Sequence, residues 1–416
     1  MNLLRPRRGF TETQEQLATR HSRGKLVLTV FQFATLMGVI VLVVLLLTII
    51  NNSFGYSAVE NKVDPENLTV NGVSLEGQTK EQLVAALQQN VSAGLFARFE
   101  HDQPIAERDA ANIYDLIQEY VISPEVVESW NFYDSLTRKD EILVLMQERY
   151  PNAELQFLSW VNWDFVRSQQ SSHPEIAGVR TAILGSVWTI SIAIFFSLPV
   201  GVAAAVYLQE YAADNFINRI IQTNINNLAG VPSIIYGILG LAIFVRAFAA
   251  FTSGIAFGAA DPSTANGRTI ISAGLTLGVL VLPLIIINAQ EAIKAVPNSL
   301  REASFGIGAT RWETVWSHVL PNAVAGILTG SILAVSRAIG ETAPLVVIGA
   351  STFIQVDPEG PFSKFTTLPA QIYQWTVRPQ GAFHNIAAAA SLVLLILLLA
   401  LNATAIVLRN RYSRRL

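Results

Sequence analysis

Cysteine is absent from this 416-residue sequence, and charged residues are scarce. Without cysteine the chain can form no disulfide, offer no thiolate to a metal and use no thiol nucleophile. Asp, Glu, Lys and Arg make up 14% of the residues, against about 25% in a typical soluble domain. Hydrophobic residues make up 51%. This balance indicates an integral membrane protein.

Two further absences exclude classes of function. The sequence has no Gly-x-x-x-x-Gly-Lys-Ser/Thr loop, so we expect this chain not to bind ATP itself. A net charge of -3 gives no indication of a nucleic-acid partner. No group of residues has catalytic or metal-ligand spacing, and His101 and His173 stand alone. We therefore expect a chain that is not an enzyme and holds no cofactor or metal.

Six apolar stretches approach or exceed the 20 or so residues that a helix needs to cross a bilayer. They cover residues 26–50, 181–208, 228–250, 270–288, 323–348 and 385–408. The first is too long for a signal-peptide core, so we interpret it as an uncleaved anchor. Basic residues gather before it and after the last stretch, which predicts that both termini are cytoplasmic. These are Arg5, Arg7, Arg8, Arg20, Arg23, Lys25, Arg409, Arg411, Arg414 and Arg415.

Residues 51–177 differ from the rest of the chain because they are polar and acidic. Between residues 51 and 179 there are 20 Asp and Glu against eight Lys and Arg, a net charge of -12. We predict an extracytoplasmic insertion domain here, which serves as a spacer or docking element. Thr79 and Gln82 have the spacing of a capping box, residues 139–149 favour a second helix, and residues 68–75 favour a strand. The predicted organisation is a tail and first span (1–50), the insertion (51–177) and a helical membrane core (178–416).

The segment between the fourth and fifth apolar stretches is polar and long for a connection between packed helices. Residues 291–321 read EAIKAVPNSLREASFGIGATRWETVWSHVLP, and Pro297 predicts a new helix. Glu302, Ala303, Gly308 and the pair Leu320-Pro321 have the spacing of the EAA loop of ABC importer permeases, which this segment resembles. Ser304 and His318 depart from that pattern. The resemblance implies a coupling loop at about residues 290–321, in which Arg301 and Glu302 make charged contacts at the rim of an ATPase subunit.

Three more motifs are similar to those of PstA-type phosphate permeases of the binding-protein-dependent transport permease family. They are NLAGVPSIIYG from Asn227, Leu282-Pro283 and RAIGETAPL from Arg337. The resemblance covers roughly residues 160–416 and the first span, and it implies an all-α bundle of six transmembrane helices in a bacterial inner membrane. It also implies partners: a homologous PstC-type permease, two ATPase subunits and an extracytoplasmic phosphate-binding protein.

Arg337 and Glu341 are ionisable residues deep inside the fifth apolar stretch. A charge at the bilayer centre costs at least about 2.5–3.5 kcal/mol, so such residues tend to face a polar interior and to be functional. The i, i+4 spacing places both on one helix face. Arginine suits an oxyanion because its planar fork donates parallel hydrogen bonds. We predict that the pair lines the substrate pathway, with Pro344 kinking the helix beside it and Gly326, Gly330 and Ala334 forming a close-packing face.

Together these features predict the permease subunit of an ATP-driven phosphate importer. One alternative is a permease for another oxyanion, such as sulfate or molybdate. A secondary transporter would leave the EAA-like loop without a purpose. A membrane sensor that uses residues 51–177 is a further alternative, although we expect no cytoplasmic output domain beyond Leu416.

Overall fold

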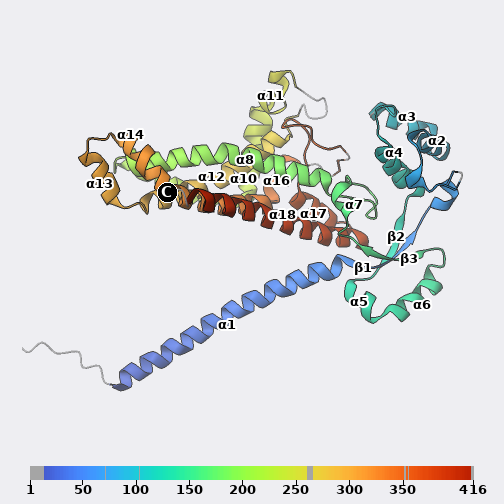
Figure 1. Ribbon diagram of the computed structural model, residues 1–416, viewed down its shortest axis with the longest axis horizontal. Coiled ribbons are helices and arrows are strands. Elements are labelled where there is room, and N and C mark those ends of the chain that lie inside the picture. The colour runs from blue at the N-terminus through green and yellow to red at the C-terminus, as the bar shows by residue number, and fades with distance from the viewer. Residues whose placement is uncertain are drawn as a thin grey trace, which may run out of the picture.

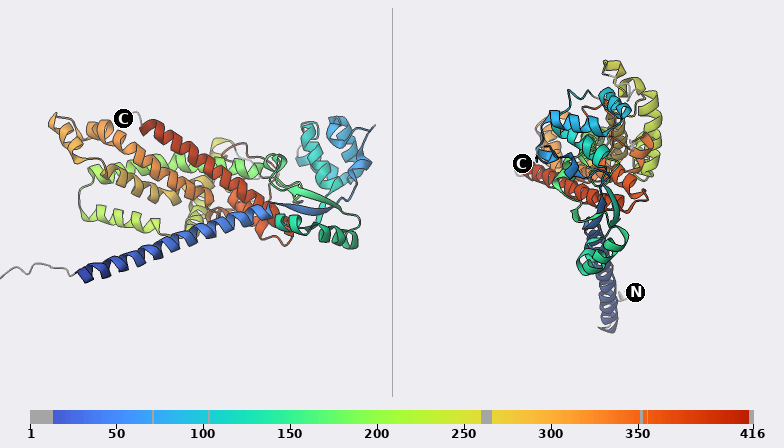
Figure 2. Two further views of the ribbon diagram at one scale, coloured as in Figure 1. Left: turned by 60° about the horizontal axis from the view of Figure 1, so that its bottom comes forward. Right: turned by 90° about the vertical axis from the view of Figure 1, so that its right-hand side faces the viewer.

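The computed structural model describes residues 14–413 except 71, 103, 260–265, 351, 352 and 355. Arg5, Arg7, Arg8, Arg414 and Arg415 lie outside the described residues. Long helices form the body of the molecule, and a small mixed region projects from one end (Figure 1). The opposite end carries α13, α14 and the C-terminus (Figures 1 and 2).

Among the described residues, five helices are long and apolar enough to cross a membrane, and a sixth span results if one bent helix pair is counted as a single crossing. Two of them are extended by π-helical turns, at Tyr207–Tyr211 after α8 and at Val315–Val319 before α15. The five long helices are α1 (Gln14–Asn52), α8 (Arg180–Val206), α12 (Ile270–Lys294), α15 (Leu320–Gly340) and α18 (Gly381–Ser413).

The bent pair corrects the expected continuous span over residues 228–250. α9 (Phe216–Ala229) ends near the start of that stretch. The next helical segment, which begins with α10 (Ser233–Gly240), makes an angle of 105° with α9. Gly230 and Pro232 stand between them, and proline lacks the N–H that a continuing helix would use. α10 runs on through a π-helical turn (Leu241–Ala247) to α11 (Ala249–Thr252), followed by a 3-10 turn (Ile255–Phe257). α11 projects sideways from the long helices (Figure 1).

α12 is the central helix of the bundle, and small residues let its neighbours approach it closely. A Cβ on Gly274 would lie 2.7 Å from Ile192 of α8. On the other side, a Cβ on Gly330 of α15 would lie 2.3 Å from the Asn288 side chain, and one on Gly326 would lie 2.7 Å from Ala292. The predicted close-packing face of α15 is therefore confirmed, and it packs against α12.

We expected the fifth apolar stretch to form one helix with a kink at Pro344. The structure differs, because α15 stops at Gly340. Glu341 has extended backbone angles, and a short helix α16 (Ala343–Ile348) starts with Pro344 in its first turn. Proline fits a first helical turn but not a helix interior, so the chain restarts there. A loop then leads to α17 (Leu368–Thr376), which precedes α18. Arg337 consequently lies in the last turn of α15 and not at mid-helix.

The region between α1 and α8 combines a three-stranded antiparallel sheet with short helices. Its strand order is β2–β1–β3, with β1 (Phe54–Glu60) at the centre, flanked by β2 (Glu125–Ser129) and β3 (Glu154–Ser159). The six helices are α2 (Lys80–Asn90), α3 (Ala93–Asp102), α4 (Ala110–Ile117), α5 (Phe132–Thr137), α6 (Lys139–Arg149) and α7 (Trp163–Arg167).

Local predictions for this region had mixed outcomes. The helix over Lys139–Arg149 and the capping box are confirmed, since Gln82 Oε1 accepts a hydrogen bond from the Thr79 N–H. The strand over residues 68–75 is wrong. That segment holds the end of one 3-10 turn, the start of another and a single bridge between Val70 and Val73. Proline and glycine around it favour turns over a strand pairing.

Residues 61–124, which we call the helical lobe, form a unit with its own apolar core. Leu83, Leu87, Ile113 and Ile117 are fully or nearly fully buried within it. The lobe is inserted into the β1–β2 pair, where Glu60 faces Glu125. The Lys62 N–H donates to the Ile122 carbonyl at 2.9 Å, so the chain enters and leaves the lobe at one point.

The sheet, unlike the helical lobe, packs against the membrane helices. Trp160 and Phe165 share an apolar core with Trp375 of α17 and Phe383 of α18. Asn385 Nδ2 donates to Ser129 Oγ at 3.1 Å. The sheet is thus anchored to one end of the bundle.

Candidate functional site

The EAA-like segment forms a short exposed helix at the far end of the bundle (Figure 1). α13 (Asn298–Gly306) begins after Pro297, as the sequence predicts. The chain then turns through Gly308, whose φ of +89° lies in the left-handed region that favours glycine. α14 (Arg311–Thr314) follows, with the Thr310 backbone and hydroxyl both donating to Glu313.

Arg301, which we expect to make a charged contact at the rim of an ATPase subunit, is largely buried within this chain. Its side chain is 14% exposed and forms a 2.7 Å ion pair with Glu210, which follows α8. Its guanidinium also donates to the carbonyls of Ile293 and Val296, at the end of α12. The Ile293 carbonyl also accepts from the Val296 N–H at 3.2 Å, so Arg301 adds a second donor at the end of α12. Arg301 therefore ties α13 to the ends of both α8 and α12.

Ser304, one of the two departures from the EAA pattern, has a structural purpose. Its hydroxyl lies 2.9 Å from Thr314 Oγ1, and both residues are buried. This hydrogen bond fastens α13 to α14. His318, the other departure, lies exposed in the π-helical turn before α15.

The outward surface of α13 and the following turn is largely apolar. Glu302 and Ala303 are exposed, as are Phe305 and Ile307, the latter by 85%. Trp312 and Trp316 stack with ring centroids 5.4 Å apart and are each about 60% exposed. Exposed apolar patches of this kind mark protein or membrane contacts. We call residues 302–308 the coupling face.

Leu320 and Pro321 occupy the first positions of α15, immediately after this turn. Pro321 fits there because the first helical N–H groups have no intrahelical acceptor. Val319 beside them is fully buried against α12 residues such as Ile293. The turn that follows α13 and α14 is therefore packed against α12 at the start of α15.

Arg337 and Glu341 meet where α15 ends. Arg337 Nε lies 3.3 Å from Glu341 Oε1, and the two side chains are 43% and 17% exposed. The neighbouring Ala334 and Ala338 pack on Tyr236 of α10, so the pair borders the bent α9–α10 segment. The Arg337 side chain is thus accessible at the surface of the subunit, whereas Glu341 is largely buried beside it.

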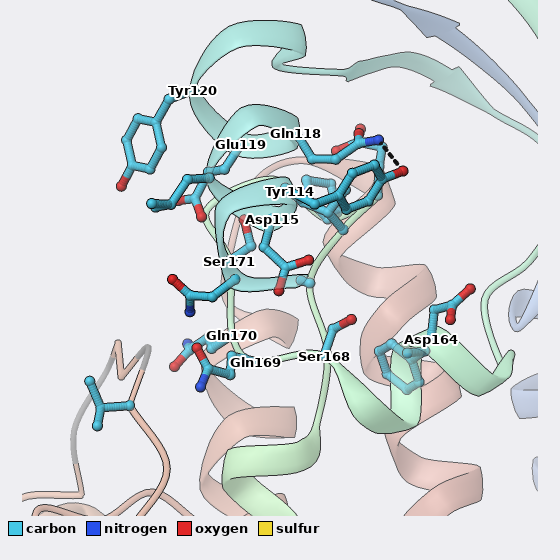
Figure 3. A pocket seen from close by; sticks show the side chains of 18 of the residues that line it. Tyr114, Asp115, Gln118, Glu119, Tyr120, Asp164, Ser168, Gln169, Gln170 and Ser171 are labelled. Atoms are coloured by element: carbon cyan, nitrogen blue, oxygen red, sulfur yellow. Dashed lines mark hydrogen bonds between the residues drawn. The ribbon is translucent and has the colours of Figure 1, made fainter. Parts of the chain in front are cut away.

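A cavity of about 960 Å³ lies between the helical lobe and the segment that leads from β3 to α8 (Figure 3). Its walls come from α4 with the turn after it, from the segment Ser168–Ala177 and from the loop near Glu359. Tyr114, Asp115 and Gln118 lie on one side, facing Ser168 and Gln170 on the other (Figure 3). No group of three or more His, Asp or Glu that could hold a metal occurs among the residues that the structure describes.

Two carboxyl groups of this cavity have raised pKa values. Burial raises the pKa of Asp115 to about 6, although Arg180 opposes the shift. Burial raises the pKa of Glu175 to about 7, and hydrogen bonds from its own N–H and from that of Val126 oppose the shift. The Val126 N–H lies 2.5 Å from Glu175 Oε1, and Glu175 Oε2 is buried. These groups change charge between mildly acidic and neutral pH.

The sequence reasoning missed Glu210, Asp115 and Glu175. Glu210 lies 91 positions before Arg301, and no local pattern connects them. Burial of Asp115 and Glu175 arises from the packing of the lobe against residues 168–177, which no spacing in the sequence reveals. The sequence gives one signal for Glu210: it follows the apolar stretch 181–208, which places it at the end of a predicted span.

Comparisons with known proteins identify the family of this chain. The family model described as "Binding-protein-dependent transport system inner membrane component" matches residues 197–416. The probable ABC transporter permease protein YqgI of Bacillus subtilis is 32% identical over 260 residues, which are 60% of this chain and 83% of that protein.

Two further relatives are named phosphate transport system permease proteins. PstA 1 of Mycobacterium tuberculosis H37Rv is 32% identical over 239 residues, 57% of this chain and 71% of that protein. PstC of Haemophilus influenzae is 32% identical over 234 residues, 52% of this chain and 68% of that protein. Among solved structures, a chain of the inward-facing MetNI methionine ABC transporter matches 56% of this chain and 97% of its own, with a TM-score of 0.41 and 18% identity. The family model covers more than half of the sequence, and this protein therefore belongs to the binding-protein-dependent inner membrane permeases of ABC transporters.

Proposed function

We propose that this permease subunit imports phosphate. The observation that carries the proposal is the accessible Arg337 guanidinium, held against Glu341 where α15 ends. Support also comes from the relatives named as phosphate permeases. The family implies a second permease, an ATPase and a binding protein. We propose that these are a PstC-type permease, two ATPase subunits and an extracytoplasmic phosphate-binding protein.

In this proposal the coupling face docks on an ATPase subunit. Glu302, Ala303 and Gly308 lie on it, while Arg301, Leu320 and Pro321 connect it to the membrane helices. ATP-driven movement of the ATPase pair shifts α13, and the Arg301–Glu210 ion pair passes that shift to α8 and α12. A contact made by exposed apolar residues and backed by a buried ion pair can transmit force in both directions.

The anion follows the surface that carries Arg337. An accessible guanidinium can donate two parallel hydrogen bonds to an oxyanion, and it stays charged at every physiological pH. Glu341 weakens that attraction, which suits an ion that must leave again. The proposed orientation places residues 51–177 outside the bacterial inner membrane and α13 in the cytoplasm.

The direct test is purification of the complex from its native membrane, followed by uptake measurements in proteoliposomes. We expect an ATPase to co-purify and labelled phosphate to enter the vesicles only with ATP and binding protein. Uptake of sulfate or molybdate in preference to phosphate would favour the alternative of another oxyanion permease. Uptake without any ATPase would contradict the proposed mechanism.

A further inference from the structure

An exposed apolar surface lies at the junction between α1 and the sheet. The apolar run of α1 ends at Ile50 and is followed by three polar residues, so the boundary of the bilayer lies at this end of the helix. α5 adjoins the same point, because the Tyr133 N–H donates to Asn51 Oδ1 at 2.8 Å (Figure 1). The surface of α5 therefore lies at the level where the bilayer meets water.

β1 holds α5 in this place. Ser135, which is buried, accepts a hydrogen bond from the Tyr56 N–H at 2.8 Å and donates to the Asn131 carbonyl at 2.7 Å. Asn131 also caps the helix, since its side chain accepts from the Asp134 N–H. One side of α5 is thus fastened to the strand into which α1 continues.

The other side of α5 is apolar and exposed. Tyr133 and Leu136 are each 66% exposed, and Phe132 is exposed beside them. The Phe132 ring lies between those of Phe54 and Phe157, with centroids 6.3 and 6.4 Å away in edge-to-face arrangements. Phe157 of β3 is itself about half exposed. We call Phe132, Tyr133, Leu136 and Phe157 the aromatic base.

Two features indicate that the aromatic base contacts the bilayer. It adjoins the end of α1, whose side chains are exposed over residues 20–48 and whose apolar length suits a membrane span. Its composition also fits the interface, where aromatic rings gather at the level of the lipid headgroups. Arg138 and Lys139 follow α5 directly and are exposed, which suits basic residues on the water side of such a surface.

We propose that the aromatic base rests in the headgroup layer of the bilayer and fixes the height of the sheet above the membrane. It lies outside residues 197–416, which the family model matches, so the contact belongs to the insertion and holds whichever substrate the permease carries. Arg138 pairs with Glu141 at 2.7 Å, and Asp134 and Asp140 are close in the sequence. The local charges nearly cancel, and burial of apolar surface is therefore the main contribution to the contact.

The absence of cysteine from the chain allows a nitroxide spin label to be placed at one position at a time. Leu136→Cys and Tyr133→Cys both place the label on the exposed side of α5. The complete complex is studied in phosphatidylcholine nanodiscs, where oxygen concentrates in lipid and a water-soluble nickel chelate is excluded from it. We expect the label at both positions to collide more often with oxygen than with the nickel chelate.

Gln88→Cys is the matched control. Gln88 is an exposed helical position on α2 in the helical lobe, which lies on the other side of the sheet from α5 (Figures 1 and 2). A label there should collide more often with the nickel chelate than with oxygen. The ratio of oxygen to nickel collisions should therefore be several-fold higher at positions 133 and 136 than at position 88.

The two collision rates distinguish lipid from the other surroundings. Frequent nickel collisions at positions 133 and 136 would place the aromatic base in water. Low rates with both reagents would place it against another protein of the complex. Either result overturns the proposal.

Lipid charge gives an independent test of the apolar contact. Addition of phosphatidylglycerol to the nanodiscs should leave the collision ratio at position 136 unchanged at low and at high salt, because the charges beside the aromatic base nearly cancel. A ratio that rises with phosphatidylglycerol and falls again with salt would show that anionic lipid recruits this surface. That result contradicts a contact made by apolar burial.

Discussion

Arg301 and Glu210 are separated by 91 positions in the sequence, yet their side chains form a 2.7 Å ion pair and are 14% and 12% exposed. The pair joins the coupling helix α13 to the end of α8. Since Arg301 also holds the last carbonyls of α12, one guanidinium fixes the position of the coupling face relative to two membrane helices.

Glu210→Gln should destabilise the assembly and uncouple transport from ATP hydrolysis. Removing one partner of a buried ion pair typically costs about 3–5 kcal/mol, because the other charge is left uncompensated. The measurements are the melting temperature of the purified complex and the ratio of uptake to ATP hydrolysis. Asp214→Asn is the matched control, because the Arg219–Asp214 pair is 73% and 85% exposed. If both variants behave alike, the buried pair does not transmit the motion.

Ile307→Asp or Glu302→Lys should abolish ATP-driven uptake while leaving the protein in the membrane. Both residues lie on the coupling face, where Ile307→Asp places a charge among exposed apolar side chains and Glu302→Lys reverses the charge already present. Gly308→Val should act through the backbone, since a β-branched residue is strained at a φ of +89°. Substrate-stimulated ATPase activity in proteoliposomes is the readout. Normal coupling in all three variants would remove this face from the mechanism.

Arg337→Gln should stop phosphate uptake, because the anion then meets no compensating charge at this point of the path. Arg337→Lys, the control that keeps the charge and loses the planar fork, should retain part of the activity. Glu341→Gln should admit sulfate more readily, since an ionised carboxylate accepts a hydrogen bond from a phosphate hydroxyl but repels fully ionised sulfate. The assay compares both anions in a complex that transports without its binding protein. Normal uptake by Arg337→Gln would reduce the pair to a packing element.

The helical lobe should be removable without loss of the membrane core. Replacing residues 61–124 by Asn-Gly converts β1 and β2 into a simple hairpin, because Glu60 already faces Glu125. Protease accessibility of the membrane-inserted protein should then match the wild type at every span. Inverted or missing spans would show that the lobe directs assembly. A similar deletion extended through Phe165 should fail, because that residue packs on Trp375.

Glu175 should make the region around β2 less stable as the pH rises. Its pKa is raised in the folded protein to about 7, so the unfolded chain loses its proton first between about pH 4.5 and 7, and stability falls over that window. The loss amounts to roughly 3 kcal/mol for the group. Hydrogen exchange of the Val126 amide, corrected for its intrinsic rate, reports it. Glu175→Gln should flatten the dependence, whereas exposed Glu154→Gln should not.

Sequence patterns identified most of the membrane helices and the coupling segment because those features are local. Apolar length marks a span, and Pro297 with Gly308 marks the ends of a short exposed helix. Sequence patterns did not predict features that depend on packing between segments far apart in the chain. Apolar composition alone does not reveal the 105° bend after Ala229 or the end of α15 at Gly340. From the sequence, Arg301 is expected to be a surface charge. Its burial depends on Glu210, which the fold brings beside it at the end of α8.

α1 passes into β1 with only Ser53 between them, and the Trp160 N–H donates to the Ser53 carbonyl at 3.0 Å. The helix therefore continues into the sheet without a linker, and this hydrogen bond ties the junction to the residue after β3. With 39 residues at 1.5 Å each, α1 is a lever roughly 58 Å long. A tilt of about 5° at the sheet therefore moves the opposite end of α1 by roughly 5 Å. The tilt of α1, which depends on its packing against neighbouring helices and on the fit of its apolar length to the bilayer, is therefore linked geometrically to the position of the sheet.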